Sequence, residues 1–175
     1  MGDIAARSGI RKSSLFHHFA TKDELYRESL AGVLEQIGTR MMRAHEDPGT
    51  FLERMDRATL DVQRYLGDNP VAARLLVREF VNGGIHILPQ AGDVLDNVMK
   101  GAIDLLEEAM RAGTIPTQDA KHLAMSIGGV HLLYFATPEV SARLVGKDVF
   151  SKEQVEERAR IVCMHLRRLV GAPLS

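Results

Sequence analysis

The feature that most constrains the fold is a pair of short helical patterns that share a tight turn near the N-terminus. The first pattern covers 3–8 and has an apolar inner side. Gly9 follows it, and glycine can adopt the positive φ that ends one helix before the next begins. The second pattern covers 12–18, and Leu15 and Phe19, four residues apart, mark its buried side. This arrangement is typical of a helix-turn-helix unit.

The second helix has a polar outer face, which indicates double-stranded DNA as the partner. A helix of this size fits the major groove, where side chains reach base edges and phosphates. We expect Arg11 and Ser13, near the helix start, to read bases. We expect Ser14, His17 and Lys22 to anchor phosphates. The full set of predicted DNA contacts is Arg11, Lys12, Ser13, Ser14, Phe16, His17 and Lys22.

A longer pattern of fixed spacing runs through the same region. Its members are Asp3, Ile4, Ala5, Gly9, Ile10, Lys12, Ser14, Leu15, Phe16, His18, Phe19, Lys22, Glu24 and Leu25. In order and spacing this pattern resembles the signature of the TetR/AcrR family of one-component regulators. Two positions depart from the family. Arg11 stands where Ser or Thr is frequent, and Phe16 replaces the usual Tyr, so a hydroxyl that could reach a phosphate is lost.

The resemblance also implies a first helix that this sequence does not contain. In the family that helix precedes the helix-turn-helix and covers it. Without such a cover, the apolar residues around Leu15 would lie open to water, at roughly 25 cal/mol per Å² of apolar surface. Two explanations remain open: the start is misplaced or truncated, or the DNA-binding head is weakened.

Composition sets further bounds. The 175 residues include 22 Lys and Arg against 23 Asp and Glu, so the net charge is −1 and the chain is not a generally basic nucleic-acid coat. Its first 27 residues hold five basic and three acidic side chains, a balance of +2 that permits local phosphate contacts. The single cysteine, Cys163, excludes an internal disulfide and fits a reducing cytosol. With no signal-like segment and no membrane-spanning run, we expect a soluble cytoplasmic protein.

Prolines, glycines and capping residues divide the rest of the chain into helices. Capping boxes are expected at Thr21, Thr50 and Ser151, and Asn69 is an expected N-cap before a proline. Helix ends are expected at glycines, Gly67 among them. The predicted helices cover 22–45, 50–66, 70–82, 91–112, 118–136 and 152–170.

These helices and the absence of strand alternation predict an all-α protein. We expect a helix-turn-helix DNA-binding head, incomplete at the N-terminus and including the connecting helix, over 1–44. A larger antiparallel helical domain for ligand binding and dimerisation, the body, covers 45–175.

The last two long helical patterns carry apolar stripes. The stripe residues are Leu123, Ile127, Val130 and Tyr134, followed by Val155, Ala159, Val162, Leu166 and Leu169. Such stripes face either the protomer's own core or a four-helix seam with a second copy. The resemblance implies the seam, because the family's regulators pair through their last two long helices. A two-fold homodimer would place two recognition helices ~34 Å apart on a palindromic operator.

The middle helices offer a candidate chamber for a small, largely apolar effector. Methionine is adaptable and suits such a pocket, although methionines also serve as core filler. The predicted ligand-binding residues are Met55, Phe80, His86, Met99, Ile103 and Met125. The glycine-containing segment 82–89 is the best candidate for a hinge or pocket mouth. The resemblance implies that a ligand in the body changes the separation of the two heads and releases DNA.

Other classes of function find little support. The sequence has no recognisable catalytic motif, and its body histidines do not form a closely spaced metal-binding pair, so we expect neither an enzyme nor a cofactor or metal. The leading hypothesis is a ligand-responsive transcriptional regulator, most simply a repressor. The alternative is a dimeric small-molecule-binding module with an incomplete, non-functional DNA head. A helical protein-interaction bundle is a third.

Overall fold

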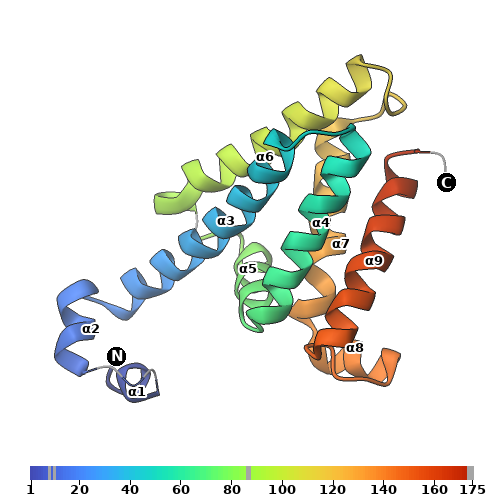
Figure 1. The fold of residues 1–175 in the computed structure, drawn as a ribbon. Helices are drawn as coiled ribbons and strands as arrows, with labels where there is room; N and C mark the ends of the chain where they lie inside the picture. Colours follow the sequence, from blue (N-terminus) through green and yellow to red (C-terminus); the bar gives the residue numbers. More distant parts are fainter. Residues whose placement is uncertain (8, 10, 86–87, 173–175) are drawn as a thin grey trace.

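The computed structural model describes residues 1–7, 9, 11–85 and 88–172, and within these ranges every regular element is an α-helix. The helices are α1 (Gly2–Arg7), α2 (Lys12–His18), α3 (Lys22–Glu46), α4 (Phe51–Asp68), α5 (Ala72–Val81), α6 (Leu88–Arg111), α7 (Ala120–Ala136), α8 (Pro138–Val145) and α9 (Lys152–Leu169). Figure 1 shows α1 and α2 at one end of the long α3, with α4, α5 and α6 beside its other part and α9 on the far side of α4. None of the described helices is long and apolar enough to cross a membrane. The all-α prediction is confirmed.

The observed helices depart from the predicted set at α8 and at the start of α5. The sequence did not predict α8, whose first residue is Pro138. Proline is well placed there, because the first turn of a helix has no partner for that N–H. The expected N-cap at Asn69 is wrong, since α5 begins only at Ala72. Asn69 instead closes α4, where its side-chain amide donates to the carbonyl oxygen of Tyr65 (2.8 Å).

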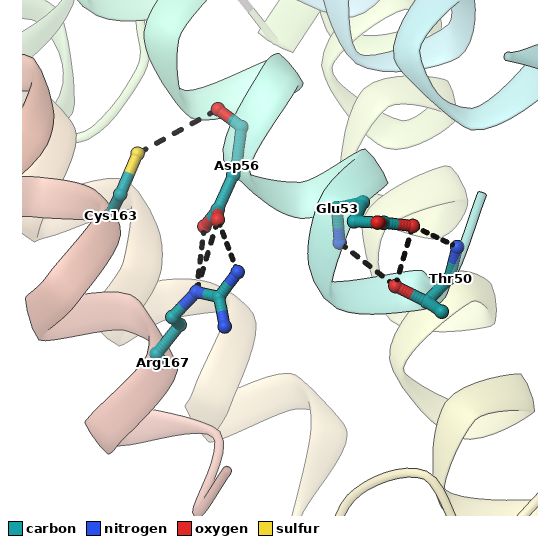
Figure 2. Close-up of polar contacts among 5 residues, drawn as sticks. All are labelled: Thr50, Glu53, Asp56, Cys163 and Arg167. Carbon is teal, nitrogen blue, oxygen red and sulfur yellow. Dashed lines mark hydrogen bonds and ion pairs between the residues drawn. The ribbon is translucent and has the colours of Figure 1, made fainter. Parts of the chain in front are cut away.

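The start of α4 is fixed by a complete capping box. The hydroxyl of Thr50 accepts from the backbone N–H of Glu53 (3.3 Å), and the Glu53 carboxylate accepts from the backbone N–H of Thr50 (2.7 Å), as drawn in Figure 2. These hydrogen bonds from Thr50 hold the pKa of Glu53 below its usual value. At Thr21 and Ser151 the hydroxyl also accepts from the backbone three residues on, whereas the returning side chains bond elsewhere.

Helix α9 lies along α4, and a glycine permits their close approach (Figure 1). Gly67 was expected to end a helix, and that prediction is wrong: it is a buried residue inside α4. A β-carbon there would lie 2.5 Å from Cγ2 of Val155 in α9. The side chains of Leu66 in α4 and Val162 in α9 are fully buried. Gly67 therefore serves helix packing rather than helix termination.

An ion pair and a thiol hydrogen bond join the same two helices nearer the start of α4. The Arg167 guanidinium donates to the Asp56 carboxylate at 2.6 and 3.0 Å, and both side chains are only about a quarter exposed (26% and 23%). The Cys163 thiol points at the carbonyl oxygen of Asp56 (3.7 Å; Figure 2). Burial raises the pKa of Cys163 to about 11, and the nearby Asp56 carboxylate adds to the shift. The thiol therefore stays protonated at neutral pH, as a packed side chain.

The apolar stripe of α9 lies largely inside the protomer, whereas only Leu123 of the α7 stripe is buried. The buried stripe residues are Leu123, Val155, Ala159, Val162 and Leu166. They serve the protomer's own core, the first of the two alternatives raised by their spacing. The apolar residues that these two helices expose are Met125, Leu133, Met164 and Leu169.

Candidate nucleic-acid interface and body groove

The head is built around the tight turn between α1 and α2. Gly9 has a φ of 67°, so the turn uses the left-handed conformation predicted for this glycine. The two helices pack against each other, with Ala5 and Leu15 only 2% and 4% exposed. Ile4 and Phe19 are only partly buried. The head thus has a small apolar centre of its own, with a rim that stays in contact with solvent.

With Leu15 turned inward, α2 presents its polar side to solvent. Arg11 is the N-cap residue, in an extended conformation, and its side chain is exposed. The other predicted contact residues with exposed side chains on α2 are Ser13, Ser14, Phe16 and His17. The helix contains no acidic residue, so nothing on it would repel a phosphate. Lys12 lies in α2, but its side chain is outside what the structure describes.

Lys22 lies at the start of the next helix. It is the first residue of α3, directly after the N-cap Thr21, and its side chain is exposed. The neighbouring carboxylate of Asp23 pairs with Arg27 (2.9 Å), which offsets part of its charge. The structure therefore gathers the described DNA-contact candidates on α2, its N-cap and the first residue of α3.

The predicted ligand-binding residues are divided between different surroundings. Three of them pack against one apolar cluster contributed mainly by α6 and α7, and they are Met55, Met99 and Ile103. Met125 is 68% exposed on α7, and Phe80 is 42% exposed near the end of α5. His86 lies outside the described residues, as does part of the predicted hinge. The structure brings three of the six together.

An apolar groove of about 270 Å³ lies between α3 and α6. Six of its lining residues are Gly38, Met41, Met42, Val98, Gly101 and Leu105. A β-carbon at Gly38 would come within 2.8 Å of Cγ2 of Val98, so the two helices nearly touch at that point. Sequence reasoning missed this groove because it assigned α3 to the head as a connecting helix. The available signal was the small residues Gly38 and Gly101 beside a pair of methionines.

A helix-turn-helix with an exposed recognition helix, joined by one long helix to an all-helical body, defines a class of one-component DNA-binding regulators. Residues 1–29 match the family model described as bacterial regulatory proteins, tetR family. Residues 48–165 match the tetracyclin repressor-like C-terminal domain. The chain belongs to the TetR family, and the resemblance read from the head is confirmed.

Several curated proteins are similar over most of the chain. The HTH-type transcriptional repressor KstR of Mycolicibacterium smegmatis is 29% identical over 150 residues, which cover 84% of this chain and 71% of the relative. The HTH-type transcriptional regulatory protein RaaS of Mycobacterium tuberculosis is 32% identical over 143 residues, or 78% and 62% of the two chains. The HTH-type transcriptional regulator RutR of Escherichia coli is 29% identical over 175 residues, or 94% and 79%. These relatives support a DNA-binding transcriptional regulator.

Proposed function

We propose that this protein is a ligand-responsive repressor that releases a palindromic operator when a small apolar molecule binds its body. Residues 1–44 would form the DNA-binding head and 45–175 the ligand-binding and dimerisation domain. The observation that carries the DNA-binding part is the exposed, acid-free face of α2 opposite the buried Leu15. The remaining parts depend on α3 and on the outer surfaces of α7 and α9.

Helix α3 offers a physical link between ligand and DNA. Its N-terminal end follows directly after the recognition helix, and its C-terminal half forms one wall of the groove. A molecule wedged between α3 and α6 would displace α3, and the head would move with it. The energy for this shift comes from the ligand's better fit to the displaced arrangement. Met99 and Ile103 of α6 and Met55 of α4 are partly buried against the apolar cluster of α6 and α7, and these side chains could repack around a larger ligand.

The outward surfaces of α7 and α9 support a two-fold homodimer. Met125 and Leu133 of α7 are 68% and 60% exposed, and Met164 of α9 is 42% exposed. A helix that is apolar on nearly all sides, as α7 is, normally has neighbours on all sides. Pairing these surfaces would bury them and set two recognition helices ~34 Å apart, one DNA turn.

Fluorescence anisotropy of the full chain on DNA from its own upstream region, at two salt concentrations, tests the proposal. We expect salt-dependent binding that exceeds binding to scrambled DNA. Arg11→Ala should weaken specific binding by about 1–3 kcal/mol while largely sparing non-specific binding. Lys22→Ala should weaken all sequences alike and flatten the salt slope by about 1.

Arg111→Ala is the matched control, because this exposed arginine lies at the far end of α6. The DNA affinity of this variant should equal that of the unmodified chain. If the unmodified chain shows no preference for its own upstream DNA, the alternative of a small-molecule-binding module with a non-functional head becomes the better account.

A further inference from the structure

A polar cluster is buried where α4, α7 and α9 meet, apart from the groove between α3 and α6. Gln63 of α4 is fully buried, and its side-chain nitrogen bonds to Nδ1 and to the carbonyl oxygen of His131 in α7 (2.9 and 3.3 Å). One turn along α7, the ring of Tyr134 lies under the Arg158 guanidinium of α9, with 4.7 Å from its central carbon to the ring centre. Arg158 also donates to the carbonyl oxygen of Val130 (2.9 Å). Each of the three helices thus supplies polar side chains to one cluster.

Three polar atoms of this cluster are shielded from solvent without a hydrogen-bond partner in the protein. They are Oε1 of Gln63, the hydroxyl oxygen of Tyr134 and Nε of Arg158. The orientation of the Gln63 amide follows from its contact with a carbonyl oxygen, which only the NH₂ group can make. Buried polar groups are normally hydrogen-bonded, so three unpaired atoms on three helices that contact one another are unusual. They include an acceptor, a charged donor and a hydroxyl that can do either.

The charges in the cluster are also unbalanced. Arg158 is partly buried and has no carboxylate within ion-pair distance among the described residues. Burial lowers the pKa of Arg158, an effect that the nearby Tyr134 only partly opposes. His131 does not compensate, because burial lowers the pKa of this histidine to about 4 and leaves the ring neutral. A partly desolvated cation of this kind is stabilised by an anion.

We propose that Gln63, Tyr134 and Arg158 recognise a small carboxylate that also carries a hydroxyl or N–H donor. The guanidinium and the Tyr134 hydroxyl donate to the carboxylate, and the ligand's own donor reaches Oε1 of Gln63. A plain carboxylate leaves the Gln63 acceptor unpaired, and a neutral alcohol leaves the charge of Arg158 unbalanced. His131 holds the Gln63 amide in position. The site shares no residue with the α3–α6 groove, so it goes beyond the apolar effector proposed above and stands independently of it.

Glycolate is a suitable probe because it carries a carboxylate and an adjacent hydroxyl. The readout is the Nε–H resonance of Arg158 in the ¹⁵N-labelled full chain, identified by its loss in Arg158→Met. We expect a saturable shift with glycolate, about 3–10-fold weaker binding of acetate, which lacks the donor, and no saturable shift with glycolamide, which lacks the charge. Tyr134→Phe should weaken the binding of glycolate by a similar factor. Arg160→Met, which removes an exposed arginine from the same helix, should leave it unchanged.

Equal, non-saturating shifts with glycolate, acetate and chloride would overturn the proposal. So would an Arg158 resonance that responds to protein concentration but not to glycolate, because the guanidinium would then pair with a second copy of the chain. Should Arg158→Met fail to fold, the resonance can be assigned sequentially and Tyr134→Phe decides the question. That substitution removes one hydroxyl and keeps the ring, so undiminished glycolate binding would reject the site.

Discussion

The head and the α4–α9 contact are held together in different ways. The head has a small centre made by Ala5 and Leu15, and most of α2 faces solvent. Along α4 and α9, fully buried side chains such as Leu66, a glycine that lets the helices approach, and the ion pair in Figure 2 act together. The comparison indicates that stability resides in the body, whereas the head keeps its polar surface free for DNA. Changes to the two regions should therefore have separable effects.

The largest expected effect comes from emptying the core of the body. Leu66 is fully buried, so Leu66→Ala should lower the free energy of unfolding by about 2–5 kcal/mol. Leu15→Ala in the head should reduce DNA affinity with a much smaller change in global stability, because the head can open locally while the body stays folded. Urea unfolding followed by circular dichroism, with anisotropy for DNA, measures both. Equal losses of stability would mean that head and body unfold as one unit.

Lowering the pH should lower the free energy of unfolding, because His131 is buried in its neutral form. Because burial lowers the pKa of His131 from 6.5 to about 4, the folded protein binds fewer protons than the unfolded chain between these values. The contribution of His131 to the free energy of unfolding is fully present above pH 6.5. It is lost as the pH falls to about 4, a change of up to about 3 kcal/mol. The unfolding free energy, measured across this range, should depend less on pH in His131→Gln. His165→Gln, at an exposed position on α9, should keep the original dependence.

Adding a β-carbon at position 67, where α4 and α9 approach each other, should lower the free energy of unfolding by less. It is nevertheless the most direct probe of close packing. Gly67→Ala places a methyl group 2.5 Å from Cγ2 of Val155, so the helices must separate, at about 1–3 kcal/mol. Gly32→Ala is its control, because nothing lies within 4 Å of that position in α3. There the substitution should stabilise by about 0.5–1 kcal/mol. Similar unfolding midpoints for both variants would show that α4 and α9 are loosely packed.

Much of the fold was predictable because its signals are local. The turn at Gly9 and the capping box at Thr50 depend on residues within a few positions, and both form as expected. Gly67 shows where such reasoning ends. A glycine late in a helical pattern predicts a helix end, but its role is set by Val155, which is remote in sequence. The α3–α6 groove was missed for the same reason, since its walls come from separate helices.

The candidate sites also differ in whether they depend on local sequence signals or on contacts between remote residues. The face of α2 follows from one motif, so its exposed residues could be named in advance. The ligand-binding set could not be fixed in this way. Helix α7 is apolar on nearly all sides, so the spacing of its residues does not reveal that Met125 faces outward and Leu123 inward. Periodicity identifies residues that share a face, whereas the neighbour of that face is decided by tertiary packing.

The smallest effect expected is at the start of α4, and it tests whether the body communicates with the head through this helix. Thr50→Ala removes the hydroxyl that accepts from the Glu53 N–H, and it should cost about 1 kcal/mol of unfolding free energy. Thr39→Ala, at an exposed position inside α3, should change stability by only a few tenths of a kcal/mol. Because the pKa of Glu53 is lowered in the folded state, the carboxylate's contribution is present above its unfolded pKa and fades in acid.

Thr50→Ala should leave DNA affinity unchanged, since the cap acts on α4 and the recognition helix is carried by α3. A parallel fall in affinity and stability would contradict the separation of the two regions. It would place the α3–α4 junction, rather than the groove along α3, on the route by which the body influences the head.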